Sequence, residues 1–314
     1  MTGPSGRRER RIGGARAFRH RATARLLLAL MSLVPRLSLE TAQAIGCFAG
    51  DAARTLLPSR RRRALEHLRL AMPERSGEHP RILRETFRHM GMVAMEALWA
   101  PGMDPVRDLT RISVANPEAV ERIRAAAEDG KRGIVFLIGH IGAWELLGPW
   151  IPAIFGRELM VVASPPHSPA LEEPMRRLRE AGNKKVVWRG DAALSLVRHL
   201  KRGGVVVLLA DHNVRGESAA VPFFGRPSQT LLAPASLALR TGALVVTGAP
   251  YRRGRGRVEV LFDDPLPLPE LPASPAARRE AEIELTAAYT ARIEALVRRD
   301  PGQWLWTHRR WRQR

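Results

Sequence analysis

Gly133-Ile-Val-Phe-Leu-Ile-Gly-His140-Ile-Gly-Ala-Trp-Glu145-Leu-Leu-Gly148 is the stretch of this chain that decides its fold. A run of apolar, mostly β-branched or aromatic residues ends at a glycine and His140. A second glycine then opens a segment whose apolar residues recur at helical spacing. The pattern predicts a buried strand over 133–139 and a helix over 142–154. Because ligand sites in open α/β sheets form at the carboxyl ends of strands, His140 is a candidate site residue.

Glu145 supplies a second functional group in the same stretch. It falls five residues after His140, in the first turn of the predicted helix, where the helix dipole favours a carboxylate. A bend in between can bring the carboxylate onto one imidazole nitrogen and leave the other free to take a proton. His140 and Glu145 are therefore a candidate general base and its orienting group, suited to transfer chemistry on a hydroxyl.

The spacing of this pair is not by itself specific. It recurs at His167/Glu172 and at His212/Glu217. His167 lies in a proline-broken loop, and His212 follows a predicted strand end without a glycine-opened helix after it. Only His140 has both features, so we expect alanine at His167 or His212 to leave most of the activity.

Strands and helices alternate from residue 133 onward. Strands are expected over 133–139, 158–163, 184–188, 204–210, 243–250 and 256–262, and helices over 142–154, 170–181, 191–201, 231–241 and 276–299. Such alternation implies an α/β fold with a mostly parallel central sheet flanked by helices. Residues 22–130 read as helices broken at prolines. We therefore divide the chain into a disordered basic tail (1–21), a helical membrane-associating region (22–130) and an α/β core (131–314).

Composition favours an enzyme that works at an anionic surface. The 314 residues carry a formal charge of +20, and 47 of the 51 basic residues are arginine, which pairs bidentately with phosphate. Nucleic acid is disfavoured as a partner, because the arginines are dispersed and no nucleic-acid motif is present. Cys47 is the only cysteine, which excludes a disulfide framework and indicates a reducing compartment.

Two short apolar runs predict how the N-terminal region meets a membrane. Leu26–Pro35 and Thr41–Gly50 are too short to span a bilayer separately, and arginines precede the first run. This arrangement predicts an interfacial anchor held by arginines on anionic lipid.

Three blocks of the sequence carry a family resemblance. Gly139-His-Ile-Gly-Ala-Trp-Glu-Leu146 resembles the His-x4-Asp/Glu block of the bacterial late acyltransferases of lipid A biosynthesis. Val221-Pro-Phe-Phe-Gly-Arg-Pro227, with Ala238–Ala243 after it, resembles a second block, and Pro301–Trp311 is similar to the family's C-terminus. The resemblance covers about residues 26 to 312. Ala143 departs from it, because the family often has a polar residue there.

The resemblance implies a glycerolipid-acyltransferase-like fold and an O-acyltransferase. The implied donor is an acyl-carrier-protein or coenzyme A thioester, with an acidic carrier protein as partner and no metal or organic cofactor. The implied acceptor is a hydroxyl of a membrane glycolipid, most directly a lipid A precursor, at the cytoplasmic face of the inner membrane. His140 and Glu145 are then catalytic. Candidate substrate-binding residues near them are Arg179, Arg189, Asp211 and Arg226.

Two alternatives remain open at this point. The same blocks occur in mycobacterial phosphatidylinositol mannoside acyltransferases, so the acceptor could be that lipid or a lysophospholipid. A non-catalytic, basic protein that binds membrane or nucleic acid is the alternative of another class. At the C-terminus, Trp304, Trp306 and Trp311 could stack at a membrane interface or pack in the core.

Overall fold

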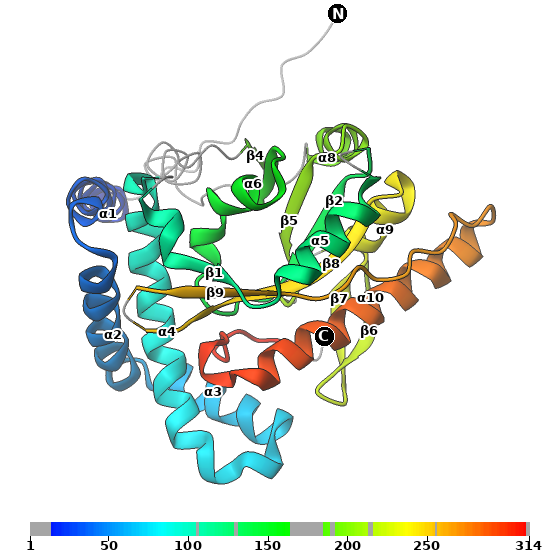
Figure 1. Ribbon diagram of the computed structural model, residues 1–314. Coiled ribbons are helices and arrows are strands. Elements are labelled where there is room, and N and C mark those ends of the chain that lie inside the picture. Colours follow the sequence, from blue (N-terminus) through cyan, green and yellow to red (C-terminus); the bar gives the residue numbers. More distant parts are fainter. Residues whose placement is uncertain are drawn as a thin grey trace, which may run out of the picture.

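The central sheet lies between two layers of helices (Figure 1). The computed structural model describes residues 14–104, 107–128, 131–163, 185–188, 192–212, 216–254 and 256–311, with side chains from residue 22 onward except Trp188. Within these residues the sheet strands are β1 (Ile112–Val114), β2 (Ile134–Ile138), β3 (Leu159–Ala163), β4 (Lys185–Trp188), β5 (Val205–Leu209), β8 (Leu244–Arg252) and β9 (Val258–Phe262). Their order is β1-β9-β8-β2-β5-β3-β4. The five strands from β8 to β4 are parallel, whereas β9 runs antiparallel to β8 and β1 runs parallel to β9.

Strand β2 is buried on both faces because every residue in it is apolar. Val135 and Leu137 pack into one hydrophobic cluster, and Ile134, Phe136 and Ile138 pack into another. This alternation is the two-residue period of a strand. The expected parallel sheet, with continuous apolar strands between two helix layers, is confirmed.

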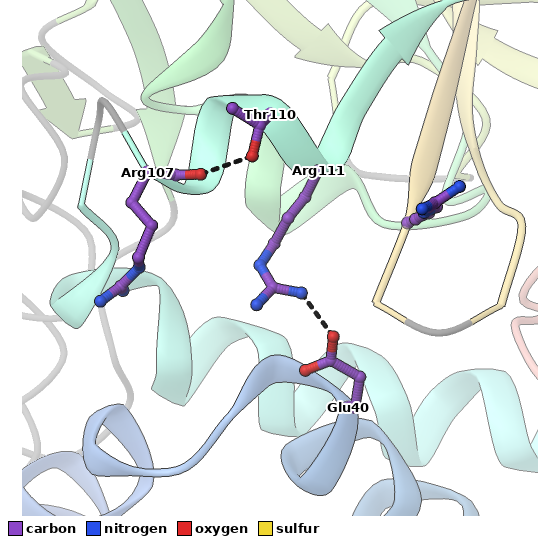
Figure 2. A pocket seen from close by; sticks show the side chains of 5 residues that line it. Glu40, Arg107, Thr110 and Arg111 are labelled. Atoms are coloured by element: carbon purple, nitrogen blue, oxygen red, sulfur yellow. Dashed lines mark hydrogen bonds and ion pairs between the residues drawn. The ribbon is translucent and has the colours of Figure 1, made fainter.

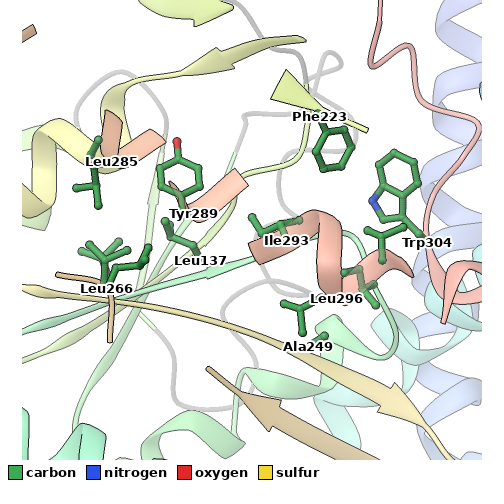
Figure 3. Packing of buried hydrophobic residues seen from close by; sticks show 14 of the residues in the cluster. Leu137, Phe223, Ala249, Leu266, Leu285, Tyr289, Ile293, Leu296 and Trp304 are labelled. Carbon is green, nitrogen blue, oxygen red and sulfur yellow. The ribbon is translucent and has the colours of Figure 1, made fainter. Parts of the chain in front are cut away.

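The helices of the α/β part cover both faces of the sheet. They are α5 (Pro117–Ala126), α6 (Trp150–Phe155), α8 (Ala192–Lys201), α9 (Ala233–Thr241) and α10 (Pro275–Arg299). Buried side chains of α8, α9 and α10 join the cluster of Leu137, and those of α5 and α6 join the cluster of Phe136. Figure 3 shows Leu285, Tyr289 and Ile293 of α10 near Leu137.

The N-terminal region is helical, as predicted. It comprises α1 (Gly14–Leu33), α2 (Leu39–Leu56), α3 (Pro58–Ala71) and α4 (His79–Trp99), with short 3-10 turns at Val34–Arg36, Pro73–Glu78, Ala100–Gly102 and Asp108–Arg111. Helix α2 begins at Ser38, whose hydroxyl accepts a hydrogen bond from Thr41 N. It packs closely on α4 because Gly46 has no side chain at the contact. A Cβ there would fall 2.6 Å from the carbonyl oxygen of Gly91.

Three sequence predictions need correction. The helix expected over 142–154 is split into a 3-10 turn (Trp144–Leu147) and α6, because Pro149 has no amide hydrogen to donate to Glu145. The region 22–130 is not wholly helical, since β1 adds to the edge of the sheet. The expected strands omit the segment around 221–227, which forms an antiparallel hairpin of β6 (Ser218–Phe223) and β7 (Arg226–Leu231).

Some of the remaining predictions are confirmed, and others concern residues that the structure does not describe. The helices expected over 191–201, 231–241 and 276–299 are confirmed. The helix expected over 170–181 lies outside the described residues, as do His167 and residues 1–13 of the tail expected to be disordered over 1–21. Residues 14–21 of that tail are helical, because α1 already begins at Gly14. Within the part of the chain that is described, no helix is both long and apolar enough to cross a membrane.

Candidate active site

The register of two parallel strands brings His140 and Asp211 together. Ile138, the last residue of β2, pairs with Leu209, the last residue of β5. Ala210 N donates to Ile138 O at 2.9 Å, which keeps the strands together at this edge. The next residues out are His140 and Asp211, so a carboxylate and an imidazole meet at the carboxyl edge of the sheet.

The loop after His140 is held rigidly by backbone contacts. Gly142 has a φ of +59°, a left-handed conformation that glycine adopts without steric cost. Its amide donates to Gln303 O at 3.0 Å, and Ala143 N donates to Pro250 O at 2.8 Å. Ala143, at the position where the family often has a polar residue, is fully buried. The loop is thus fixed from β8 on one side and from the C-terminal segment on the other.

Asp211 is buried and fully engaged. Its Oδ1 lies 2.6 Å from His140 Nδ1, and its Oδ2 accepts from His140 N at 2.8 Å and from Trp304 Nε1 at 2.7 Å. Burial opposes the charged form, but His140, His212 and these hydrogen bonds together hold the pKa of Asp211 far below its ordinary value. An ionised Asp211 places the imidazole proton on Nδ1 of His140, and so assigns the lone pair to Nε2. No described residue hydrogen bonds to that Nε2, and the side chain remains 14% exposed.

Asp211 therefore takes the place that the sequence analysis assigned to Glu145. Glu145 is half-buried in the turn after the loop, and its Oε1 accepts from Trp144 Nε1 at 3.2 Å. Trp144 in turn packs edge-on against the His140 ring at 5.1 Å. The substrate-binding role predicted for Asp211 remains a prediction, and its oxygens already accept three hydrogen bonds inside the protein. The strand register that pairs Asp211 with His140 is not visible in the sequence.

Of the three predicted arginines, only Arg226 lies within the described residues, and its contact is with α3. Arg226 begins β7, is exposed, and donates from Nε to Leu70 O of α3 at 3.3 Å. The hairpin that carries Arg226 packs against Trp304 beside the site through Phe223 and Phe224, whereas Arg226 itself lies against α3. Arg179 and Arg189 lie outside the described residues, and their substrate-binding roles remain predictions.

A buried polar chain behind His140 was not predicted. His89 of α4 faces the His140 carbonyl oxygen through Nε2 at 3.3 Å, and its Nδ1 lies 2.7 Å from Arg252 Nη1 of β8. Arg252 pairs with Glu96 of α4 at 2.5 and 2.6 Å, and Gln43 of α2 donates to Glu96 at 2.8 Å. Burial and Arg252 hold the pKa of His89 well below its ordinary value, so His89 is neutral. The one sequence signal is Glu96 itself, an acid in the apolar run 92–100.

Among the described residues, His140, Asp211 and His212 have the spacing of metal ligands, with candidate ligand atoms within 4.8 Å of one another. However, His140 Nδ1 and Asp211 Oδ1 are already hydrogen bonded to each other, and Asp211 Oδ2 accepts from Trp304. A cation on the same atoms would have to break both contacts. The arrangement fits a hydrogen-bonded His–Asp pair better than a metal centre.

The C-terminal tryptophans support the site from the core. Trp304 and Trp306 are buried and contact each other at 4.6 Å, and Phe224 of the hairpin packs against both. Trp304 and Trp306 therefore pack in the core rather than stack at a membrane interface. Trp304 also donates to Asp211, so the C-terminal block that resembles the family contributes a hydrogen bond to the site.

An imidazole with Nδ1 bound to a buried carboxylate and Nε2 free is the arrangement of a general base. At the carboxyl edge of an α/β sheet, it defines a class of enzymes that activate a hydroxyl or a water. The profile of the family described as "Bacterial lipid A biosynthesis acyltransferase" matches residues 12–313. The chain belongs to this family, and it is an O-acyltransferase.

Individual relatives agree with the assignment. The Escherichia coli (strain K12) lipid A biosynthesis lauroyltransferase is 28% identical over 296 residues, which cover 91% of this chain and 90% of the relative. The palmitoleoyltransferase of lipid A biosynthesis from the same organism is 27% identical over 276 residues, or 86% and 84%. A phosphatidylinositol mannoside acyltransferase of Mycobacterium tuberculosis is 27% identical over 128 residues, 40% of each chain.

Proposed function

We propose that the protein transfers a fatty acyl group from an acyl-carrier-protein or coenzyme A thioester to a hydroxyl of a membrane glycolipid, and that a lipid A precursor is the acceptor. The observation that carries the proposal is the 2.6 Å contact between His140 Nδ1 and the ionised Asp211. It prepares Nε2 to accept a proton. The relatives matched over most of their length are named for lipid A biosynthesis, which favours that acceptor.

In the proposed reaction, His140 Nε2 takes the proton of the acceptor hydroxyl while its oxygen attacks the thioester carbonyl carbon. The new C–O bond forms, the C–S bond breaks, and the proton passes from His140 to the departing thiolate. Asp211 holds the Nδ1 proton and stabilises the imidazolium that forms. Glu145 acts one step further out, through the Trp144 indole that packs on the ring. This sequence of steps needs no metal or organic cofactor.

An arginine-lined hollow suits the phosphate of a lipid headgroup. Figure 2 shows the hollow, of 320 Å³, beside the start of α2. Its lining residues are Glu40, Arg107, Thr110, Arg111 and Arg257. Glu40 pairs with Arg111 at 2.5 Å and Asp108 pairs with Arg107 at 2.7 Å, whereas no described carboxylate pairs with Arg257. The unpaired guanidinium gives the hollow a surplus of positive charge toward anionic groups.

The outer helices offer a surface for the bilayer. Within the described residues, seven of the ten exposed large apolar side chains fall between residues 26 and 57. On α2, Ile45, Phe48 and Leu56 are spaced to form one outward stripe, and exposed Arg36 and Arg60 flank the helix. An apolar stripe between arginines suits the interface of an anionic membrane. We place the enzyme at the cytoplasmic face of the inner membrane, where an acidic acyl carrier protein can reach it.

Lipid mass spectrometry tests the proposal directly. The full chain would be incubated with acyl-carrier-protein and coenzyme A thioesters, each against a lipid A precursor, a phosphatidylinositol mannoside and a lysophospholipid. We expect a gain of one acyl group on the lipid A precursor, lost in His140→Ala. No mass gain on any acceptor with either donor would refute the proposal.

A phosphatidylinositol mannoside is the second candidate acceptor. It is favoured by the mycobacterial relative, although that match covers only 40% of either chain. A mass gain on the mannoside alone would select it, with the same base and the same chemistry.

A further inference from the structure

Three imidazole rings stand in a row at the carboxyl edge of the sheet. The His140 and His212 rings are 3.5 Å apart between centroids and 7° from parallel, and those of His212 and His308 are 3.7 Å apart and 8° from parallel. They come from the segments after β2, after β5 and at the C-terminus. The proposed reaction uses only the first of them, so His212 and His308 have no role in it so far.

Neither outer ring of this histidine stack is built to take a proton. Burial lowers the pKa of His212 to about 3 and that of His308 to about 4, so both are neutral at physiological pH. The charged and titratable groups around the stack are Asp211 after β5, Arg310 of the C-terminal segment, His67 of α3, Glu145 beyond the loop, and His89 and Arg252 behind it. Asp211 bonds to His140 at 2.6 Å, so among the three stacked rings only His140 has a described carboxylate on one nitrogen.

The outer rings also leave hydrogen-bonding capacity unused. His212 Nε2 and His308 Nδ1 are buried without a partner among the described residues. A buried polar atom without a partner destabilises the fold, and a hydrocarbon ring would fill the same space without that cost. The contact that these rings do make is face to face, with the flat side of each neutral ring against its neighbour. A flat π-face stabilises a cation that forms above it.

We propose that His212, supported by His308, is a positioning residue that fixes the ring plane of His140 and stabilises the imidazolium form through its stacked face. Asp211 and His212 then constrain the His140 ring in different ways. Asp211 fixes the rotation of the imidazole through Nδ1, and His212 fixes its tilt. This inference rests on the proposed function only in that His140 is the base. It replaces the expectation that His212 is dispensable.

The test compares two replacements of the middle ring. His212→Ala removes the stacking face, and His212→Phe keeps a flat face but no nitrogen. We expect kcat of acyl transfer to fall by about tenfold or more in the alanine variant, since a small misplacement of a base is costly, with KM little changed. The phenylalanine variant should recover most of kcat. His79→Gln serves as the matched control, because His79 is another buried histidine and bonds to Met72 O at 2.9 Å outside the stack.

A second measurement does not depend on turnover. The imidazole nitrogen resonances of His140, followed by NMR at fixed pH, should shift and broaden in His212→Ala, because the ring is no longer held in one plane, and stay near their wild-type positions in His212→Phe. The inference is overturned if both variants behave like wild type, or if phenylalanine is as damaging as alanine in kcat and in these spectra. If the protein transfers no acyl group at all, the spectra still decide the role of the stack, so the two failures are distinguishable.

Discussion

Asp211, at the carboxyl edge of β5, is buried and accepts three hydrogen bonds, whereas Phe48 on α2 leaves 79% of its surface exposed. The first region buries charge and partners it, while the second exposes hydrocarbon. Neither arrangement stabilises a folded protein by itself. A buried charge loses its hydration, and exposed hydrocarbon loses the free energy that its burial would contribute. The difference supports the proposals that the sheet edge carries the catalytic base and that the outer helices contact a membrane.

The largest expected effect concerns which carboxylate serves His140. His140→Ala should lower kcat by on the order of 10² to 10⁴, the usual contribution of a general base. Asp211→Asn should come close to that loss, because a neutral amide cannot stabilise the imidazolium. Glu145→Gln should lose much less, since Glu145 contacts the indole of Trp144 rather than the imidazole. Steady-state kinetics on folded variants checks the order, and a greater loss in Glu145→Gln than in Asp211→Asn would return the orienting role to Glu145.

The buried chain behind the site should matter most for stability. Glu96 is fully buried and pairs with Arg252, whose side chain is 6% exposed. Glu96→Ala leaves that guanidinium buried and unpaired, which should lower the free energy of unfolding by about 3–5 kcal/mol. The control is Asp264→Ala, which breaks the exposed pair with Arg122 and should cost no more than about 1 kcal/mol. Equal losses in urea titrations of both variants would show that Glu96 does not act through this pair.

Acid should lower the free energy of unfolding through the two buried outer histidines of the stack. His212 and His308, with pKa values of about 3 and about 4, start from an ordinary 6.5. Below that value the unfolded chain binds protons that the folded chain does not, so the free energy of unfolding falls as pH drops toward 4. In His212→Phe one such group is gone, and the slope of unfolding free energy against pH should decrease by up to one proton. An unchanged slope would contradict the buried, neutral state of His212.

The sheet edge was predictable from the sequence as far as its signals are local. The apolar run before His140 defines β2, and the alternation of strands and helices defines the sheet. The pairing of His140 with Asp211 depends on strand register across 71 residues, and the pair of Glu96 with Arg252 spans 156. Neither leaves a periodic signal. The hairpin of β6 and β7 was not among the predicted strands, and the prolines and glycine in it weaken the strand pattern, although edge strands tolerate proline.

The outer helices were predictable in composition but not in geometry. The short apolar runs and arginines indicate an interface, whereas only the structure separates the face of α2 that packs on α4 from the outward one. Phe48→Ser together with Leu56→Ser should weaken binding to vesicles on the order of tenfold or more, whatever the charge of the lipid, because both side chains are mostly exposed. Leu194→Ser with Leu271→Ser is the control, being equally apolar but distant in sequence. Equal loss in both double variants would rule out a dedicated face.

The smallest expected effect separates charge from hydrocarbon on this side of the molecule. Arg257→Gln removes from the hollow the guanidinium that no described carboxylate neutralises. A basic residue near an anionic surface contributes about 1 kcal/mol, so binding to phosphatidylglycerol vesicles should weaken about fivefold and binding to phosphatidylcholine vesicles should not change. Arg240→Gln, an exposed arginine at the end of α9, should leave both unchanged. The loss should shrink as salt is raised, because exposed charges are screened over about 10 Å at 0.1 M ionic strength. A loss that is equal on both lipids would mean that Arg257 supports the fold of the hollow, and that the apolar stripe of α2 alone accounts for membrane binding.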